Sequence, residues 1–349
     1  MTTNRPVTIH DVAILAGVSE STVSRVLSGS ETTIAISEET RERVLQAARE
    51  LAYRPHPSAR ALRGKGTNLL GLIVREIDDP FFAQLIEVIS NVAKENGYDL
   101  VLGYAKSDPQ EALALSEMLD LRFCDGLFLL GDLQESPEDH SFLARMVGEN
   151  MLVFLCRGSG EDLVGDSPSV GVDNRMGAQL ALEYLAGLGH RRIAFVGSGR
   201  VGDLLERQEA YGSFMREHFG QPAPEYEQLA ENSYRGGYEA TARLLALPEP
   251  PTAIFAADDT MAIGALKVAA DRGRRVPGDL SIVGFDDTKI APYLQPALTT
   301  IRQPIAEIGR QAVDLLLAMI RGKAAPEPPI HRVIEPALVV RDSCSPPRL

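Results

Sequence analysis

The fold of the N-terminal part is decided by VTIHDVAILAGVSESTVSRVLSG, residues 7–29. The stretch holds two short helical patterns, and a Gly-Val-Ser turn joins them. Thr8 and Ser19 stand at the position that caps a helix N-terminus, and Asp11 completes a capping-box-like pattern after Thr8. Gly17 ends the first pattern, where a left-handed residue is favourable. The stretch therefore predicts a helix-turn-helix.

The second helix of this motif presents hydroxyl side chains and one arginine outward. In a helix-turn-helix, such a helix enters the major groove of DNA. Hydroxyl groups suit phosphate oxygens, and a guanidinium suits a bidentate contact with guanine. The predicted DNA-binding residues of this segment are Thr8, Ser19, Glu20, Ser21, Thr22, Ser24 and Arg25. The pattern also fits two amphipathic helices that only pack in a bundle.

A third helical pattern covers residues 38–53, with Ser37 as its predicted cap. Its apolar residues keep helical spacing. They predict a buried face made of Val44, Leu45, Ala48, Leu51 and Ala52. The next stretch, RPHPSARALRGKGTN at 54–68, has two prolines near its start and two glycines near its end. This composition predicts a linker with room for one or two helical turns.

The hydrophobic pattern of the sequence changes at Leu69. Short apolar runs follow one another, and helical patterns separate most of them; the runs are LLGLIV, DLVLGY, GLFLL, MLVFL, SVGVD, RIAFVG, TAIFAA and LSIVGF. Alternating strand and helix patterns predict βαβ units and parallel sheets with helices on both faces. Because one open sheet would have to hold many strands, we expect an α/β body of two doubly wound parallel-sheet subdomains. A ligand cleft is expected between them.

Composition narrows the class of protein. The 349-residue chain has a formal net charge of −13, but residues 1–67 hold nine basic and seven acidic residues, which leaves −15 for the rest. This asymmetry permits a basic DNA-binding head on an acidic body. No apolar run predicts a membrane span, and no leader sequence is recognised. Cys124, Cys156 and Cys344 are scattered, so we expect no disulfide framework, no metal site and a cytoplasmic location.

The chain resembles the LacI/GalR family of bacterial transcription repressors over nearly its whole length. The matching segments are residues 7–13, 16–19, 21–27, 37–41 and 51–55, followed by GVDNRMGAQLALEYLAGLGHRRIAFVG, FAADDTMAIGALKVAADRGRRVPGDLSIVGFDD and LTTIRQP. The resemblance implies an all-α helix-turn-helix head, a hinge, and a periplasmic-binding-protein-like domain for effector binding and dimerisation. These parts are expected at residues 1–55, 56–67 and 68–349.

Within the last part, the expected N-subdomain covers residues 68–168 and 300–324. The expected C-subdomain covers residues 169–299 and 325–342. In the family, the hinge folds into a short helix on the operator and inserts a leucine into the minor groove. The resemblance therefore implies DNA contacts at Ala59 and Leu62, although a solvated tether with a stray leucine fits the residues themselves.

The resemblance also implies an effector site made of Phe81, Arg157, Arg207, Asn232, Asp258 and Asp286. Asp286 matches the effector-binding aspartate of the family, whose carboxylate takes paired sugar hydroxyls. The sequence departs from the family at Asn232, where many relatives carry a stacking aromatic residue, and at Cys156, where many carry aspartate. An anionic effector would suit Arg157. Asp259 and Asp287, in contrast, are expected to cap helices.

The implied function is that of a transcriptional repressor, which binds a pseudo-palindromic operator as a homodimer. A small polar effector, a sugar or sugar derivative, is expected to control it, with a nucleoside, a purine or a protein partner as alternative signals. We expect no cofactor, because GSGRVG at 197–202 is a weak dinucleotide fingerprint and DLLERQEAYGSFM follows it. The six histidines are dispersed, so an enzyme is not expected. A periplasmic solute-binding protein would need a signal peptide.

Overall fold

The computed structural model describes residues 7–28, 36–51, 53, 66–106, 108–119, 123–131, 145–146, 151–156, 168–198, 202–220, 223–322 and 330–348. The chain forms two compact units, Met1–Thr67 and Asn68–Leu349. Three residues predicted to bind ligands, Ala59, Leu62 and Arg157, lie outside the described residues. No helix among the described residues is both long and apolar enough to cross a membrane.

The N-terminal unit contains the three predicted helices, α1 (Ile9–Ala16), α2 (Glu20–Ser28) and α3 (Glu38–Glu50). The Asp11 carboxylate accepts hydrogen bonds from both the N–H and the hydroxyl of Thr8, at 2.7 Å each. Gly17 ends α1 at φ 64°, a left-handed conformation in which glycine carries no Cβ penalty. Ser19 and Ser37 cap the next two helices through the Thr22 and Thr40 N–H groups.

A small apolar core holds these helices together. Val12, Val23 and Val44 are fully buried, one from each helix. The predicted buried face of α3 is wrong at Leu45, which is 37% exposed. The side chain that takes its place in the core is Ala47. The buried residues of this small core are all alanines and valines, and Leu45, at the edge of the apolar face of α3, lies outside it.

The C-terminal unit contains two six-stranded sheets. In spatial order, the first consists of β11 (His331–Ile334), β5 (Ser169–Val172), β4 (Leu152–Leu155), β3 (Gly126–Leu130), β1 (Leu69–Val74) and β2 (Asp99–Tyr104). The second consists of β12 (Ala337–Val339), β10 (Thr299–Arg302), β9 (Ser281–Asp286), β8 (Ala253–Ala256), β6 (Ile193–Gly197) and β7 (Glu227–Leu229). All neighbours pair in parallel except β10 and β12. The eight predicted strands and the two doubly wound sheets are therefore confirmed.

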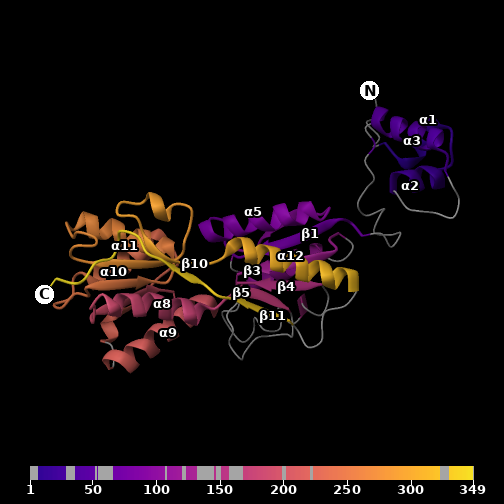
Figure 1. Ribbon diagram of the computed structural model, residues 1–349. Coiled ribbons are helices and arrows are strands. Elements are labelled where there is room, and N and C mark those ends of the chain that lie inside the picture. The colour runs from indigo at the N-terminus through magenta and orange to yellow at the C-terminus, as the bar shows by residue number, and fades with distance from the viewer. Residues whose placement is uncertain are drawn as a thin grey trace. The chain divides into compact units, whose positions relative to one another are not determined.

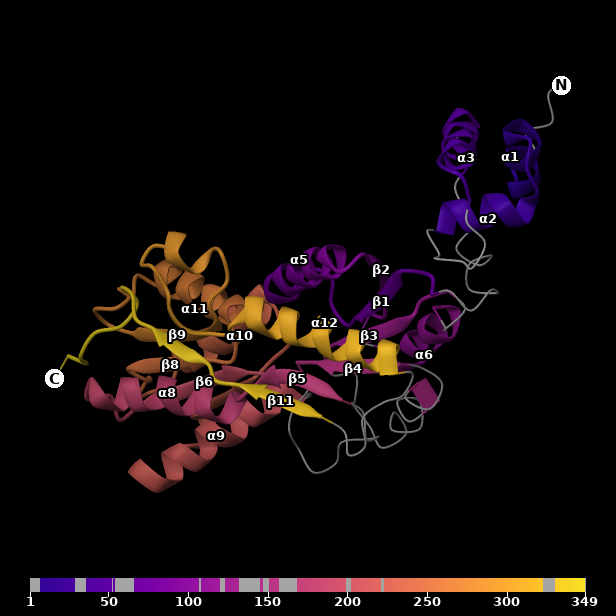
Figure 2. The ribbon, with the colours of Figure 1, turned by 45° about the vertical axis from the view of Figure 1, so that its right-hand side comes forward.

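Helices cover both faces of each sheet (Figures 1 and 2). On the first sheet, α5 (Pro80–Glu95) and α12 (Ile305–Gly322) share one apolar core, and α6 (Pro109–Met118) packs on the opposite face. On the second sheet, α8 (Asn174–Gly187) and α9 (Gly202–Phe219) lie on one face, and α10 (Tyr234–Leu244) and α11 (Asp259–Asp271) lie on the other. Two short 3-10 turns complete the described elements, at Pro224–Tyr226 and Ala291–Tyr293.

The membership of the sheets differs from the expected subdomain boundaries at three strands. β5 belongs to the first sheet, so this lobe extends past residue 168. Residues 300–324 were expected in the first lobe, but β10 belongs to the second sheet. Of this segment, only α12 packs on the first sheet. β11 also joins the first sheet. The chain thus crosses between lobes after β5, after β10 and after β11. These crossing points follow from the pairing of the strands and not from any local sequence pattern.

Two glycines let α10 and α11 approach each other more closely than side chains would allow. A Cβ added to Gly264 would lie 2.2 Å from the Tyr234 carbonyl oxygen, and one added to Gly237 would lie 2.3 Å from the Met261 carbonyl oxygen. Backbone atoms cannot yield as a flexible side chain can, so the two helices would have to separate.

We expect Gly264→Ala to lower the free energy of unfolding by about 1–3 kcal/mol or more, because overpacking forces backbone shifts. The measurement is guanidinium unfolding followed by circular dichroism. Gly187→Ala is the matched control, since Gly187 is helical and no atom lies within 4 Å of its added Cβ. The control should change stability by no more than about 1 kcal/mol. Equal effects of the two substitutions would show that the close helix approach is not the cause.

Candidate functional site

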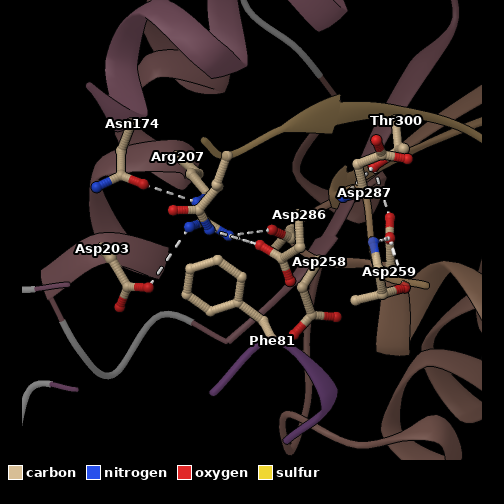
Figure 3. Close-up of polar contacts among 12 residues, drawn as sticks. Phe81, Asn174, Asp203, Arg207, Asp258, Asp259, Asp286, Asp287 and Thr300 are labelled. Atoms are coloured by element: carbon tan, nitrogen blue, oxygen red, sulfur yellow. Dashed lines mark hydrogen bonds and ion pairs between the residues drawn. The ribbon is translucent and has the colours of Figure 1, made fainter. Parts of the chain in front are cut away.

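The candidate effector site lies at the carboxyl ends of the strands in the second sheet, the edge where parallel sheets bind ligands. Asp286 is the last residue of β9, and Asp258 follows β8 after one residue. Arg207 projects from the second turn of α9, which follows β6. Figure 3 shows these side chains converging, with the ring of Phe81 beside them. Four residues predicted to bind the effector are thus brought together.

Arg207 is the centre of this cluster and is only 2% exposed. Its Nε donates to Asn174 Oδ1 at 3.0 Å, and its Nη1 donates to the Ala257 carbonyl oxygen at 2.7 Å. Nη1 also lies 3.7 Å from Asp286 Oδ1, and Nη2 lies 3.5 Å from Asp203 Oδ2. The guanidinium carbon sits 3.6 Å from the centroid of the Phe285 ring. A planar, permanently charged group held on all sides has a fixed orientation toward the cleft.

Asp286 is held in a strained backbone conformation. Its φ is 115°, which non-glycine residues rarely adopt, and such strain is concentrated at functional sites. Gln303 Nε2 donates to Asp286 Oδ1 at 2.7 Å. Burial raises the pKa of Asp286 well above its ordinary value, and the Asp258 carboxylate adds to the rise, while Arg207 opposes it. The carboxyl group is therefore a strong hydrogen-bonding partner in a dry environment.

The helix cap expected at Asp259 is instead made by Asp258. Asp258 caps α11, since its Oδ1 accepts from the Met261 N–H at 2.7 Å. Asp259 was expected to be the cap but is fully buried and accepts from the hydroxyls of Thr288 and Thr300. Burial raises the pKa of Asp258 to about 7 and that of Asp259 to about 6. Asp258 therefore binds the helix with one oxygen and keeps the other for the cleft.

Asp287 was also expected to cap a helix, and this expectation is wrong. Its carboxylate accepts from Arg302 Nε at 2.6 Å and from Arg341 Nη2 at 2.5 Å. Arg302 lies on β10, and Arg341 follows β12. Asp287 thus fastens the C-terminal segment to the sheet and has no free oxygen to offer a ligand.

The first lobe contributes Phe81 and Cys156 to the same cluster. Phe81 is 3% exposed and lies in the first turn of α5, where Asp79 caps the helix by accepting from the Phe81 and Phe82 N–H groups. Cys156 lies at the end of β4 with φ 55°. Burial raises the pKa of its thiol, and the charges that act on it include Asp203 and Arg207. The thiol of Cys156 is therefore uncharged at neutral pH.

Asn232 precedes α10 and is half-buried, and its Oδ1 has no hydrogen-bond partner. Sequence reasoning missed two neighbours of the cleft, Asp203 and Tyr234. Asp203 lies one helical turn before Arg207, and its Oδ1 is buried without a partner. Tyr234 begins α10, and its pKa is raised first by burial and then by the Asp258 and Asp79 carboxylates. The i, i+4 spacing from Arg207 was the one sequence signal for Asp203.

The predicted DNA-binding side chains of the N-terminal unit gather at the start of α2. Ser19, Glu20 and Ser21 are exposed, whereas Thr8, Thr22, Ser24 and Arg25 are half-buried. The Ser19 hydroxyl lies 2.7 Å from that of Ser21. Glu20 Oε1 lies 2.8 Å from His10 Nδ1, a neighbour that the sequence did not suggest. The N-terminus of α2 thus presents hydroxyls and one carboxylate to solvent.

In the described part of the chain, no three His, Cys, Asp or Glu side chains are grouped so as to hold an ion. Figure 3 shows the acidic side chains of the cleft instead arranged around Arg207. The arrangement offers one cation, several carboxyl oxygens and an aromatic ring. It can bind a small molecule rich in hydrogen-bond donors.

Comparisons with known proteins cover nearly the whole chain. The family model "Bacterial regulatory proteins, lacI family" matches residues 8–56, and the model "Periplasmic binding protein-like domain" matches residues 182–344. The HTH-type transcriptional repressor CytR of Escherichia coli (strain K12) is 34% identical over 340 residues, which cover 96% of each chain.

Two solved structures show the same likeness. The lac repressor dimer bound to operator and the anti-inducer ONPF superposes with a TM-score of 0.85 at 29% identity, and the match covers 98% of this chain and 100% of that chain. A complex of the transcriptional regulator CelR with cellobiose gives a TM-score of 0.70 at 31% identity, with 97% of this chain and 100% of that chain covered.

Proposed function

The chain belongs to the LacI family of bacterial regulatory proteins, and from that premise we propose that its effector is a hydroxyl-rich small molecule held by Arg207 and Asp286. The protein is a DNA-binding transcriptional regulator that acts as a dimer on operator DNA and responds to a small molecule. Its relatives are regulators and not enzymes. What the proposal adds is the chemistry of the ligand and the residues that recognise it.

The observation that carries the proposal is the buried pairing of Arg207 with Asp286. A guanidinium donates in a plane and a carboxyl group accepts, so together they match the adjacent hydroxyls of a sugar ring. Phe81 and Tyr234 bring aromatic rings to the same place, and an aromatic face packs on the C–H face of a sugar. A related regulator binds cellobiose, which favours a sugar here. A nucleoside is the second candidate, because its pentose has the same hydroxyls and Tyr234 offers its base a stacking surface.

For the head, we propose that the DNA contacts come from Thr8, Ser19, Glu20, Ser21, Thr22, Ser24 and Arg25, with Ala59 and Leu62 of the hinge. The support is the exposed group of hydroxyls at the N-terminus of α2, where helix N–H groups favour phosphate. The Glu20–His10 contact adds a condition: Glu20 must exchange His10 for a cytosine amino group to read a base edge.

A thermal-shift screen with sugars, sugar acids and nucleosides tests the effector proposal. A neutral sugar or nucleoside at about 100 times its Kd should stabilise the protein by about 2.7 kcal/mol. The same compound should change the affinity for a DNA site selected from a random library, measured by fluorescence anisotropy, by about 5- to 150-fold. A ligand that stabilises Asp286→Asn as strongly as the wild-type protein would place the binding site elsewhere and refute the proposal.

A further inference from the structure

The cleft carries more negative charge than its two arginines balance. Among the described residues around it, Arg75 and Arg207 are the cations. The acidic side chains whose charges act on one another there are Glu76, Asp78, Asp79, Asp203, Asp258, Asp259 and Asp286. Seven carboxyl groups thus face two guanidinium groups, and burial favours the protonated form of Asp258 and Asp286. Buried charge without compensation is costly, so the site favours a ligand that brings positive charge.

The geometry of an unsatisfied atom points the same way. One buried side-chain oxygen beside Arg207 has no hydrogen-bond partner, Asp203 Oδ1. A carboxylate oxygen only accepts hydrogen bonds. It therefore requires a donor from the ligand. Leaving a buried acceptor unsatisfied is costly, so a ligand with a donor here binds more tightly than one without.

A proton or a metal ion would be the other ways to neutralise the carboxyl groups. An organic cation is a third way, and the described residues contain no metal-ligating group of three. Protons already neutralise part of the negative charge, because burial raises the pKa of Asp258 to about 7 and that of Asp286 well above its usual range. An ammonium group replaces such protons and adds three directed donors.

We propose that the effector carries a protonated amine, as an amino sugar does, and that Asp203 Oδ1 accepts a hydrogen bond from it. This inference rests on the proposed hydroxyl-rich effector and adds one group to it. Asp203 is well placed for the role, since its Oδ2 already faces Arg207 and its position on α9 is fixed by that contact.

Matched pairs of ligands test the inference by isothermal titration calorimetry with the full-length protein. The pairs are glucosamine with glucose, galactosamine with galactose, and mannosamine with mannose, each with its N-acetyl derivative, which removes the charge. At least one amino sugar should bind about tenfold or more tightly than both its neutral partners, because charge-assisted hydrogen bonds are about twice as strong as neutral ones. Asp203→Asn should abolish that difference. Asp271→Asn, an exposed acidic residue on α11, should preserve it.

The outcomes separate this inference from the proposed function. If neutral sugars or nucleosides bind and every amino sugar binds no better than its neutral partner, the amine is refuted while the hydroxyl-rich effector stands. If an amino sugar is preferred but Asp203→Asn keeps the preference, the assignment to Asp203 is refuted. If no sugar, amino sugar or nucleoside binds, both the inference and the proposed function fall.

Discussion

Replacing Arg207 with methionine is expected to abolish effector binding and to lower the free energy of unfolding by about 3–5 kcal/mol at pH 8. Methionine fills much of the same volume but carries no charge. The substitution leaves Asp203 and Asp286 buried without their cation, and it leaves the Ala257 carbonyl oxygen and Asn174 Oδ1 without a donor. Removing one partner of a buried ion pair is costly for this reason. Guanidinium unfolding measures the stability, and calorimetry measures effector binding.

The size of the loss should depend on pH and on the replacement. At pH 5 the loss should shrink, because protonation of Asp286 removes the uncompensated charge. Arg207→Lys keeps the charge but not the planar fork, so it should fall between methionine and wild type. Arg235→Met is the control: Arg235 is an exposed helix residue paired with Glu239, and an exposed ion pair contributes little to stability. If Arg207→Met costs no more than this control, the buried charge cluster is not ionised as described.

Most of the strands that could be predicted from the sequence are buried on both faces; β2, whose residues are mostly exposed or half-buried, is the exception. β1, β3 and β9 are continuous apolar runs, and a run bounded by turn residues needs no knowledge of its neighbours. β7, β11 and β12 have only three or four residues, most of them half-buried or exposed. Their strand conformation comes from pairing with a distant segment, which no local pattern encodes. The three crossings between lobes were misplaced for the same reason.

The candidate site divides in a similar way. Arg207, Asp258 and Asp286 were found through resemblance, because they stand in motifs that match along the chain. Asp203 was missed because an acidic residue in the first turn of a helix is the ordinary complement to the helix dipole. Tyr234 was missed because the resemblance assigned the ligand-stacking position to Asn232, two residues earlier. Only the fold shows that Tyr234 lies close enough to Asp258 for that carboxylate to act on its pKa.

The second large effect is expected from Asp258→Asn, which should stabilise the ligand-free protein increasingly as pH rises from about 4 to 7. The pKa of Asp258 is about 7 in the folded protein, against about 3.9 for an aspartate in an unfolded chain. A raised pKa means that its ionisation opposes folding, so the wild-type protein loses stability across this interval and asparagine does not. Asparagine keeps the helix cap, because its Oδ1 can accept from the Met261 N–H. The gain should reach about 2–4 kcal/mol at pH 8.

The difference in unfolding free energy between variant and wild type, measured at pH 4, 5, 6, 7 and 8, isolates this one group from all others that titrate. Asp108→Asn is the matched control for replacing an N-cap carboxylate with an amide, since Asp108 caps α6 at the surface. The charge excess in the cleft and the gain from Asp258→Asn have one cause, which is carboxyl groups buried together. A flat difference for Asp258 would therefore mean that the cleft already compensates its carboxylates, and the argument for an amine on the effector would lose its electrostatic ground.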